Sequence, residues 1–395
     1  MQRSHSGRSD AAVKHTHWRA ALLTGVLVAA AAIWQAQALA SEVYQSEQHA
    51  YRVVTVADGL AHPWGMTFLP SGEMLVTERD GHLRVVRDGE LLSEPVSGLP
   101  QMVVGGQGGL LDVALDPDFA DNSLIYLAYA GGESGNAGTE VARGRLDLEA
   151  MALRDVETIF RVAPKTPGTA HYGGRLQFHP DGTLYVTLGD RRNYMDEAQE
   201  LDSHIGTIVR INPDGSVPAD NPFADREDAK PEIYTYGNRN VQGIALRPGT
   251  ETIWAHEHGP RGGDELNILK PGANYGWPEI TYGIDYSGAT ISEKTEAPGM
   301  EQPVVYWDPS IAPSGMTFYD GEAFPQWRGD IFLGALAHRH LRRLELDGDE
   351  VVAQEELLGE LGARIRDVRG GPDGMLYVLT DAADGRILRL EPAGD

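Results

Sequence analysis

The sequence predicts an all-β protein, specifically a six-bladed β-propeller built from four-stranded antiparallel blades. The first observation is a phrase that recurs six times: a short apolar run, a turn rich in Pro, Asp and Gly, and a second apolar run. The second is that 47 glycines and 23 prolines among 395 residues supply the turns that many short strands need. The third is that no long stretch of helical periodicity follows residue 40.

Each copy of the phrase predicts a β-hairpin, because glycine in the turn adopts a positive φ without steric cost. In chain order the copies are Trp64–Thr77, Leu110–Ala128, Gly174–Thr187, Gln242–Trp254, Gly315–Leu333 and Ile365–Leu379. A third apolar run follows several hairpins, as at Leu83–Val86, Ile208–Ile211 and Leu341–Leu346. A pair of β-sandwiches or a β-helix is the alternative, and the uneven spacing of the copies favours the propeller. Loops between propeller strands surround the mouth of an axial channel, where we expect functional residues.

The first 40 residues have the pattern of a secretory signal peptide. Basic residues precede the apolar run Ala20–Trp34, and small residues follow in Ala36–Ala40. An uncleaved anchor is the alternative, but the run is short for a membrane span of about 20 residues. We therefore expect a signal peptide over residues 1–40, one propeller domain over residues 41–395, and a periplasmic protein with no membrane span after cleavage.

Composition excludes several functions. The formal net charge of −25 argues against a nucleic-acid partner, since an acidic surface repels phosphates. The absence of cysteine excludes disulfides, thiolate nucleophiles and cysteine-ligated metal clusters. A hard metal ion remains as a possible cross-link.

Two polar residues flank the third hairpin. His171 precedes its first strand and Asp190 follows its second. A histidine there can act as a general base, and the carboxylate can hydrogen-bond it and fix its tautomer. A solvated loop histidine is the alternative. No G-x-S-x-G nucleophile motif is present.

Three further segments carry candidate ligand-binding groups. Arg239 offers a fork of donors for an anionic or carbonyl oxygen, with a surface ion pair as the alternative. The loop Glu257–Leu266 has carbonyls and acids on a Gly/Pro backbone, which suits Ca²⁺, although the acids could simply cap a hairpin. Arg364 and Arg366 project to one face of a strand, as expected for binding a multiply charged anion, unless Asp367 or nearby glutamates pair with them.

The sequence resembles the soluble quinoprotein glucose/sorbosone dehydrogenases, and within them the aldose sugar dehydrogenases. The resemblance runs from about residue 50 to residue 392. The motifs that carry it are Gly106–Leu111, His171 with Gly174–Leu176, Gly237–Gly243, His258–Pro260 with Asp264–Asn267, Asn274–Pro278, Ala312–Ser314 and Arg364–Val368. Five or more such motifs in the family's order are strong evidence for the resemblance, and seven are present here.

This resemblance implies a six-bladed propeller that uses pyrroloquinoline quinone (PQQ) and Ca²⁺ to oxidise aldoses at the anomeric carbon, giving lactones. It implies that His171 is the base, that Asp190 orients it, and that Arg239 polarises the quinone carbonyl. The implied cofactor ligands are Gln107, Arg239, Asn240, Arg364 and Arg366. The implied Ca²⁺ ligands are the main-chain oxygens of Gly259 and Pro260 for one ion, with Glu265 and Tyr275 holding a second, structural ion.

Two positions depart from the glucose-specific members of the family, which have an acid where this chain has Ala170 and a lysine where it has Ala337. We therefore expect broad aldose specificity. Shortened insertions favour a monomer, and the sequence does not identify the electron acceptor. The alternatives are a propeller that binds sugars or partners without redox turnover, and a metal-dependent propeller lactonase.

Overall fold

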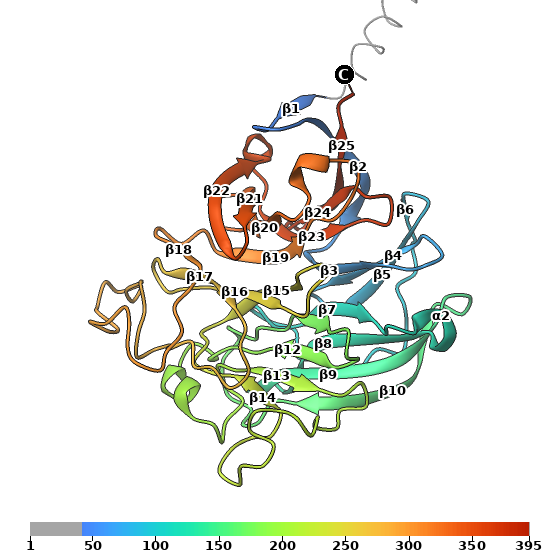
Figure 1. The fold of residues 1–395 in the computed structure, drawn as a ribbon. Helices are drawn as coiled ribbons and strands as arrows, with labels where there is room; N and C mark the ends of the chain where they lie inside the picture. Colours follow the sequence, from blue (N-terminus) through green and yellow to red (C-terminus); the bar gives the residue numbers. More distant parts are fainter. Residues whose placement is uncertain (1–41, 395) are drawn as a thin grey trace, which may run out of the picture. The chain divides into compact units, whose positions relative to one another are not determined.

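The computed structural model describes residues 42–394, and those from Tyr44 onward form one compact unit. Six antiparallel sheets follow one another along the chain, and Figure 1 shows them in sequence order from blue to red. The innermost strands contact one another in the cyclic order β3, β7, β11, β15, β19, β23 and back to β3. The predicted six-bladed β-propeller is therefore confirmed. The predicted signal peptide lies outside the described residues, so its cleavage and the domain boundary stay predictions.

Five blades have four strands each, and chain order is also the order from the inside of the blade outward. Their strands are β3 (Pro63–Phe68), β4 (Met74–Glu78), β5 (His82–Arg87) and β6 (Glu90–Leu91); β7 (Leu110–Leu115), β8 (Leu124–Glu133), β9 (Asn136–Asp147) and β10 (Ala152–Arg161); β11 (Leu176–Phe178), β12 (Leu184–Thr187), β13 (Ile208–Ile211) and β14 (Ile233–Thr235); β15 (Val241–Leu246), β16 (Ile253–Glu257), β17 (Asp264–Ile268) and β18 (Val305–Trp307); and β19 (Pro313–Phe318), β20 (Ile331–Ala335), β21 (His340–Asp347) and β22 (Glu350–Leu357).

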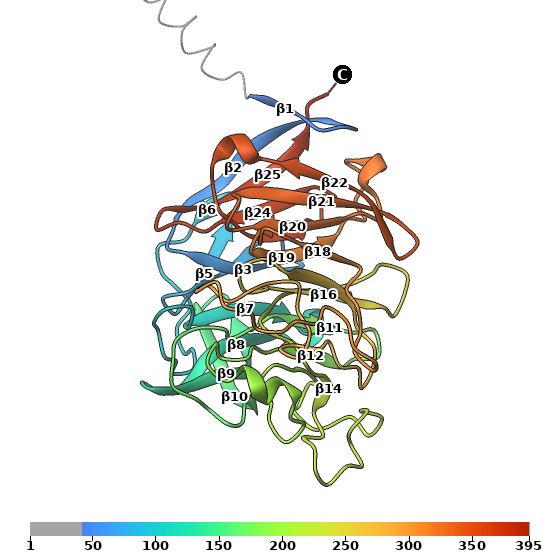
Figure 2. The same ribbon diagram turned by 90° about the vertical axis from the view of Figure 1, so that its left-hand side faces the viewer.

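The sixth blade joins the two ends of the propeller. It has the order β1-β2-β25-β24-β23, with β1 (Val43–Gln45), β2 (Ala50–Leu60), β23 (Ile365–Gly370), β24 (Leu376–Thr380) and β25 (Gly385–Pro392). The N-terminal strand β2 pairs with the C-terminal strand β25, and Figure 2 shows the two side by side. This pairing closes the ring and leaves β1 as a short fifth strand of this blade.

The six repeated phrases form β-hairpins, as the sequence predicts, and the structure shows that these hairpins are the two innermost strands of each blade. Within residues 42–394 the helices are few and short: α2 (Phe119–Asn122) and the 3₁₀ segments η1 (Met195–Gln199), η2 (Pro325–Trp327) and η3 (Gly359–Leu361). Among the described residues, no helix has the length and apolar character needed to cross a bilayer.

An ion cluster occupies the axis, where the innermost strands meet. Arg175, whose residue exposure is 1%, lies 2.9 Å from Asp367 and 3.6 Å from Asp112. Its guanidinium also donates to the main-chain oxygens of Gln242 and Arg366. Because these partners come from three other blades, one buried side chain ties the blades together.

Glycines make room for this cluster. A Cβ on Gly315 would lie 1.7 Å from a carboxylate oxygen of Asp367, and one on Gly65 would lie 2.4 Å from Asp112. Side chains at these two positions would therefore displace the acids that neutralise Arg175.

We predict that Arg175→Met lowers the free energy of unfolding by about 3–5 kcal/mol, because it leaves buried carboxylates without their cation. Urea unfolding of the purified variant measures this. Arg226→Met is the matched control, since Arg226 pairs with Asp228 at the exposed surface, and it should change stability far less. Equal losses in the two variants would contradict the assigned importance of the axial cluster.

Candidate active site

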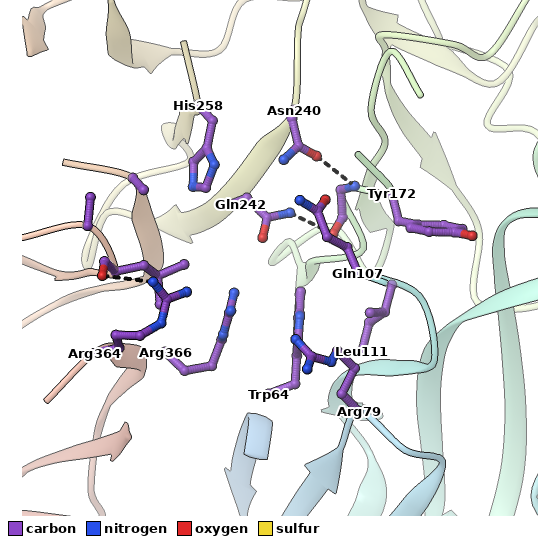
Figure 3. Close-up of a pocket in the computed structure, with 14 residues that line it drawn as sticks. Trp64, Arg79, Gln107, Leu111, Tyr172, Asn240, Gln242, His258, Arg364 and Arg366 are labelled. Atoms are coloured by element: carbon purple, nitrogen blue, oxygen red, sulfur yellow. Dashed lines mark hydrogen bonds between the residues drawn. The ribbon is translucent and has the colours of Figure 1, made fainter. Parts of the chain in front are cut away.

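Strand direction gathers the candidate residues at one end of the axis. In an antiparallel hairpin, the start of the innermost strand and the end of the second strand lie at the same end of the blade. The loops there line a cavity of about 280 Å³, shown in Figure 3. Four predicted cofactor ligands line it, namely Gln107, Asn240, Arg364 and Arg366.

The lining of this cavity is basic. It includes three arginines, Arg79, Arg364 and Arg366, and no carboxylate. Arg364 and Arg366 share one counter-ion, since Asp381 lies 3.1 Å from the first and 2.9 Å from the second. Burial alone would raise the pKa of Asp381, but the two guanidiniums hold that pKa well below its usual value.

Asp367 is the alternative ion-pair partner that the sequence offers for Arg364 and Arg366, and this alternative is wrong. Adjacent residues of a strand point to opposite faces, so Asp367 points away from the side chain of Arg366. It pairs instead with Arg175 and Arg369 in the axial cluster.

The predicted His–Asp pair is present and buried. His171 Nδ1 lies 2.6 Å from Asp190 Oδ1, and Trp277 Nε1 donates to the other carboxylate oxygen at 2.9 Å. The carboxylate accepts a hydrogen bond from Nδ1–H, so Nε2 of the neutral ring keeps its lone pair. Burial lowers the pKa of His171 below its usual value, and the hydrogen bond that His171 donates to Asp190 opposes that shift. The imidazole is therefore poised as a neutral proton acceptor.

The backbone at His171 is held in an unfavourable conformation. Its φ is +52°, in the left-handed region that few side chains adopt. Gln107 accepts a hydrogen bond from its main-chain N–H at 2.7 Å. The buried Arg191 donates to the main-chain oxygens of Gly168 and Ala170 and stacks on the Tyr172 ring, 3.7 Å from its centroid. These contacts fix the loop that carries His171.

Arg239 lies over a pair of main-chain oxygens. Its Nη1 donates to His258 O at 3.0 Å and to Gly259 O at 2.7 Å. Its Nε is buried without a hydrogen-bond partner. The carbonyl of Gly259, a predicted metal ligand, therefore already faces a cation. Pro260, the second predicted ligand, lines a neighbouring cavity of about 160 Å³ together with Arg239 and Trp277.

Two glutamates face each other behind Arg239. Glu257 and Glu265 are paired across β16 and β17 and line one small cavity with Tyr275. Burial raises the pKa of both carboxyls, and the charge of Glu257 raises that of Glu265 further. Such a pair of hard oxygen ligands suits a divalent cation. The Tyr275 hydroxyl donates to Ile268 O at 2.7 Å, so its main-chain oxygen is the group left to serve as a ligand.

Asp264, one of the acids that the sequence places on this loop, stabilises the loop by accepting hydrogen bonds from Gly259 N and from the Ser310 hydroxyl. Three other residues of this region, Glu257, Asp381 and Arg79, were not predicted as site residues. Each of these residues lies at the end of the second strand of a blade or directly after it. Because the repeated phrases mark where the second strands end, this shared position could have been found from the sequence.

The fold and the site together define a propeller protein with a basic axial cavity beside a buried His–Asp pair. The chain belongs to the Glucose / Sorbosone dehydrogenase family, whose model matches residues 60–389.

Similar proteins agree with this assignment. Aldose sugar dehydrogenase YliI of Escherichia coli (strain K12) is 44% identical over 95% of this chain and 99% of its own. A crystal structure of a glucose dehydrogenase is 50% identical, covers 85% of this chain and 98% of its own, and has a TM-score of 0.83. The PQQ-bound aldose sugar dehydrogenase of Streptomyces coelicolor is 31% identical, covers 86% of this chain and 98% of its own, and has a TM-score of 0.72.

We predict that Asp190→Asn lowers the pKa of His171 further below its usual value, because the neutral amide no longer favours the imidazolium. Nuclear magnetic resonance titration of the His171 ring, assigned by comparison with His171→Gln, measures it. An unchanged or higher pKa in the variant would contradict the assigned pairing.

Proposed function

We propose that this protein oxidises aldose sugars at the anomeric carbon to lactones, using PQQ and Ca²⁺, with broad sugar specificity. The observation that carries the proposal is the cavity lining, which presents three arginines and no carboxylate in a chain of net charge −25. A site this basic in so acidic a protein is built for an anion. The PQQ in the Streptomyces coelicolor relative supports the identity of that anion.

The residues present fit PQQ, a flat tricarboxylate. Arg364 and Arg366 offer guanidinium forks to carboxylates, and Gln107 and Asn240 offer amide groups on the wall near His171. The buried, unpartnered Nε of Arg239 is a further donor in the same region. When bound, PQQ supplies a two-electron acceptor for the hydride that leaves the anomeric carbon.

The protein's own residues handle the proton and the charge. His171 Nε2 takes the proton of the anomeric hydroxyl, because Nδ1 is committed to Asp190. Asp190 then stabilises the imidazolium that forms. Arg239 contributes positive charge beside the base, in a position that favours oxygen atoms that gain negative charge.

Two calcium sites are part of the proposal. The main-chain oxygens of Gly259 and Pro260 would hold one ion near the cofactor, and Glu265 with Tyr275 O would hold the second. The convergence of His258 O and Gly259 O on the Arg239 guanidinium supports the first, since these oxygens already face a cation. The facing Glu257 and Glu265 carboxyls support the second.

We also propose that the protein is exported to the periplasm and is a monomer. The reaction needs an electron acceptor, which the sequence does not identify. A propeller lactonase is disfavoured by the axial cluster. Asp112 and Asp367, the acids available at the axis, are paired with Arg175 and Arg369 and so are not free to hold a metal. A propeller that binds sugars without turnover would not need the buried His–Asp pair.

We predict that His171→Ala retains PQQ binding but lowers dye-linked aldose oxidation by about 10²–10⁴-fold, the usual contribution of a general base. The measurement is turnover at saturating PQQ and Ca²⁺, after spectroscopic titration has established equal cofactor occupancy. Near-normal turnover in the folded variant would remove His171 from the mechanism. No turnover by the wild-type protein with any aldose would contradict the proposed function.

We predict that a chelator lowers the melting temperature of the wild-type protein, because an ion bound only by the folded state stabilises it, by about 2.7 kcal/mol at a hundred times its dissociation constant. Glu265→Gln should lower the melting temperature in calcium and abolish the response to chelator. Glu301→Gln is the matched control, since Glu301 pairs with Lys270 near the surface. A full chelator response in Glu265→Gln would contradict the assigned site.

A further inference from the structure

Three arginines line the axial cavity, and the proposed function assigns a specific ligand role to Arg364 and Arg366 but not to Arg79. Its half-buried side chain lines the cavity, and Figure 3 shows it on the side opposite Arg364 and Arg366. Nothing among residues 42–394 forms a hydrogen bond or ion pair with its guanidinium. Arg364 and Arg366, by contrast, both pair with Asp381.

The position of Arg79 in its blade is one that the fold uses repeatedly. It directly follows β4, the second strand of the first blade. The equivalent residues after β16 and β20 are His258 and Leu336, which line the same cavity. The equivalent residue after β24 is Asp381, which holds the two arginines of the opposite wall. The register of the blades therefore directs this position toward the cavity.

The main chain of Arg79 is also fixed. A Cβ on Gly109 would lie 1.7 Å from Arg79 O and 3.3 Å from Arg79 Cγ, so only glycine allows the loop to pack this closely. This is the loop that carries Gln107, a neighbour of His171. The loop thus holds the base of the arginine side chain while the guanidinium stays free.

The charge of the cavity lining indicates what kind of ligand the unpaired guanidinium of Arg79 can bind. One carboxylate, Asp381, serves both Arg364 and Arg366, and the lining itself contains no acid. The cavity therefore keeps an excess of positive charge that a bound polyanion would neutralise. An arginine fork matches a carboxylate in geometry as well as charge.

We propose that Arg79 binds a carboxylate of the anionic cofactor on the wall opposite Arg364 and Arg366. The ligand is then held from both sides of the cavity, by paired arginines on one and a single arginine on the other. This inference rests on the proposed function, since it takes PQQ as the polyanion.

The test is titration of PQQ into the calcium-loaded protein, followed by quenching of tryptophan fluorescence. Arg79→Met should weaken PQQ binding about tenfold to a hundredfold, the usual loss for one charge-assisted hydrogen-bonded pair. Arg79→Lys should lose less, because it keeps the charge but not the fork. Arg87→Met is the matched control, since it removes an arginine of the same blade that pairs with Glu73 outside the cavity, and it should bind PQQ as the wild type does.

A second probe separates carboxylate binding from a structural effect. The trimethyl ester of PQQ has no charged carboxylates, so wild type and Arg79→Met should bind it equally. Equal loss of PQQ and ester in Arg79→Met, or a lowered melting temperature of that variant without ligand, would overturn the proposal. So would unchanged PQQ binding in Arg79→Met while the wild type binds. If the wild type itself binds no PQQ, the proposed function fails instead.

Discussion

The buried guanidinium of Arg175 is the interaction on which the rest of the structure depends. It pairs with acids from the second and sixth blades, donates to carbonyls of the fourth and sixth, and stacks on Trp64 of the first at 4.1 Å. A charge removed from water is tolerated only with full compensation, so these blades must meet in one arrangement. That requirement fixes the innermost strands, and the ends of those strands carry the candidate site.

The position of His171, the proposed base, also depends on the axial cluster. His171 precedes β11 only a few residues before Arg175, so its loop leads into a strand that the axial cluster already holds. The loop bends back with φ of +52° at His171, a conformation that the surrounding contacts must enforce. Arg191 does so by bridging the loop carbonyls, and Asp190 aligns the ring. Because several contacts hold this strained loop in one conformation, the proposed proton acceptor keeps a fixed position.

The sequence allowed the inner strands to be predicted because turn residues and apolar runs are local signals. The His171–Asp190 pair was also accessible, since both residues flank one hairpin. The partner of Arg364 and Arg366 was not predictable, because Asp367 and Asp381 are both aspartates close to these arginines or to the same strand pair, and only strand pleating and blade register choose between them. Arg79 was missed for the same reason, because the opposite wall of its cavity comes from the sixth blade, at the far end of the chain. Glu257 and Glu265 lie on adjacent strands, and only the strand register brings them face to face.

The closure of the ring by β2 and β25 determines when the molecule can finish folding. Their register joins Tyr51 to Pro392, so the closing contacts span nearly the whole described chain. Bringing such distant segments together carries a loop-closure entropy that is recovered only when the pairing forms. Until the last strand has been synthesised, β2 and β24 each present an unpaired edge, and exposed edges invite association with other chains. A truncation of only the last ten residues would therefore harm assembly more than the loss of an entire surface loop.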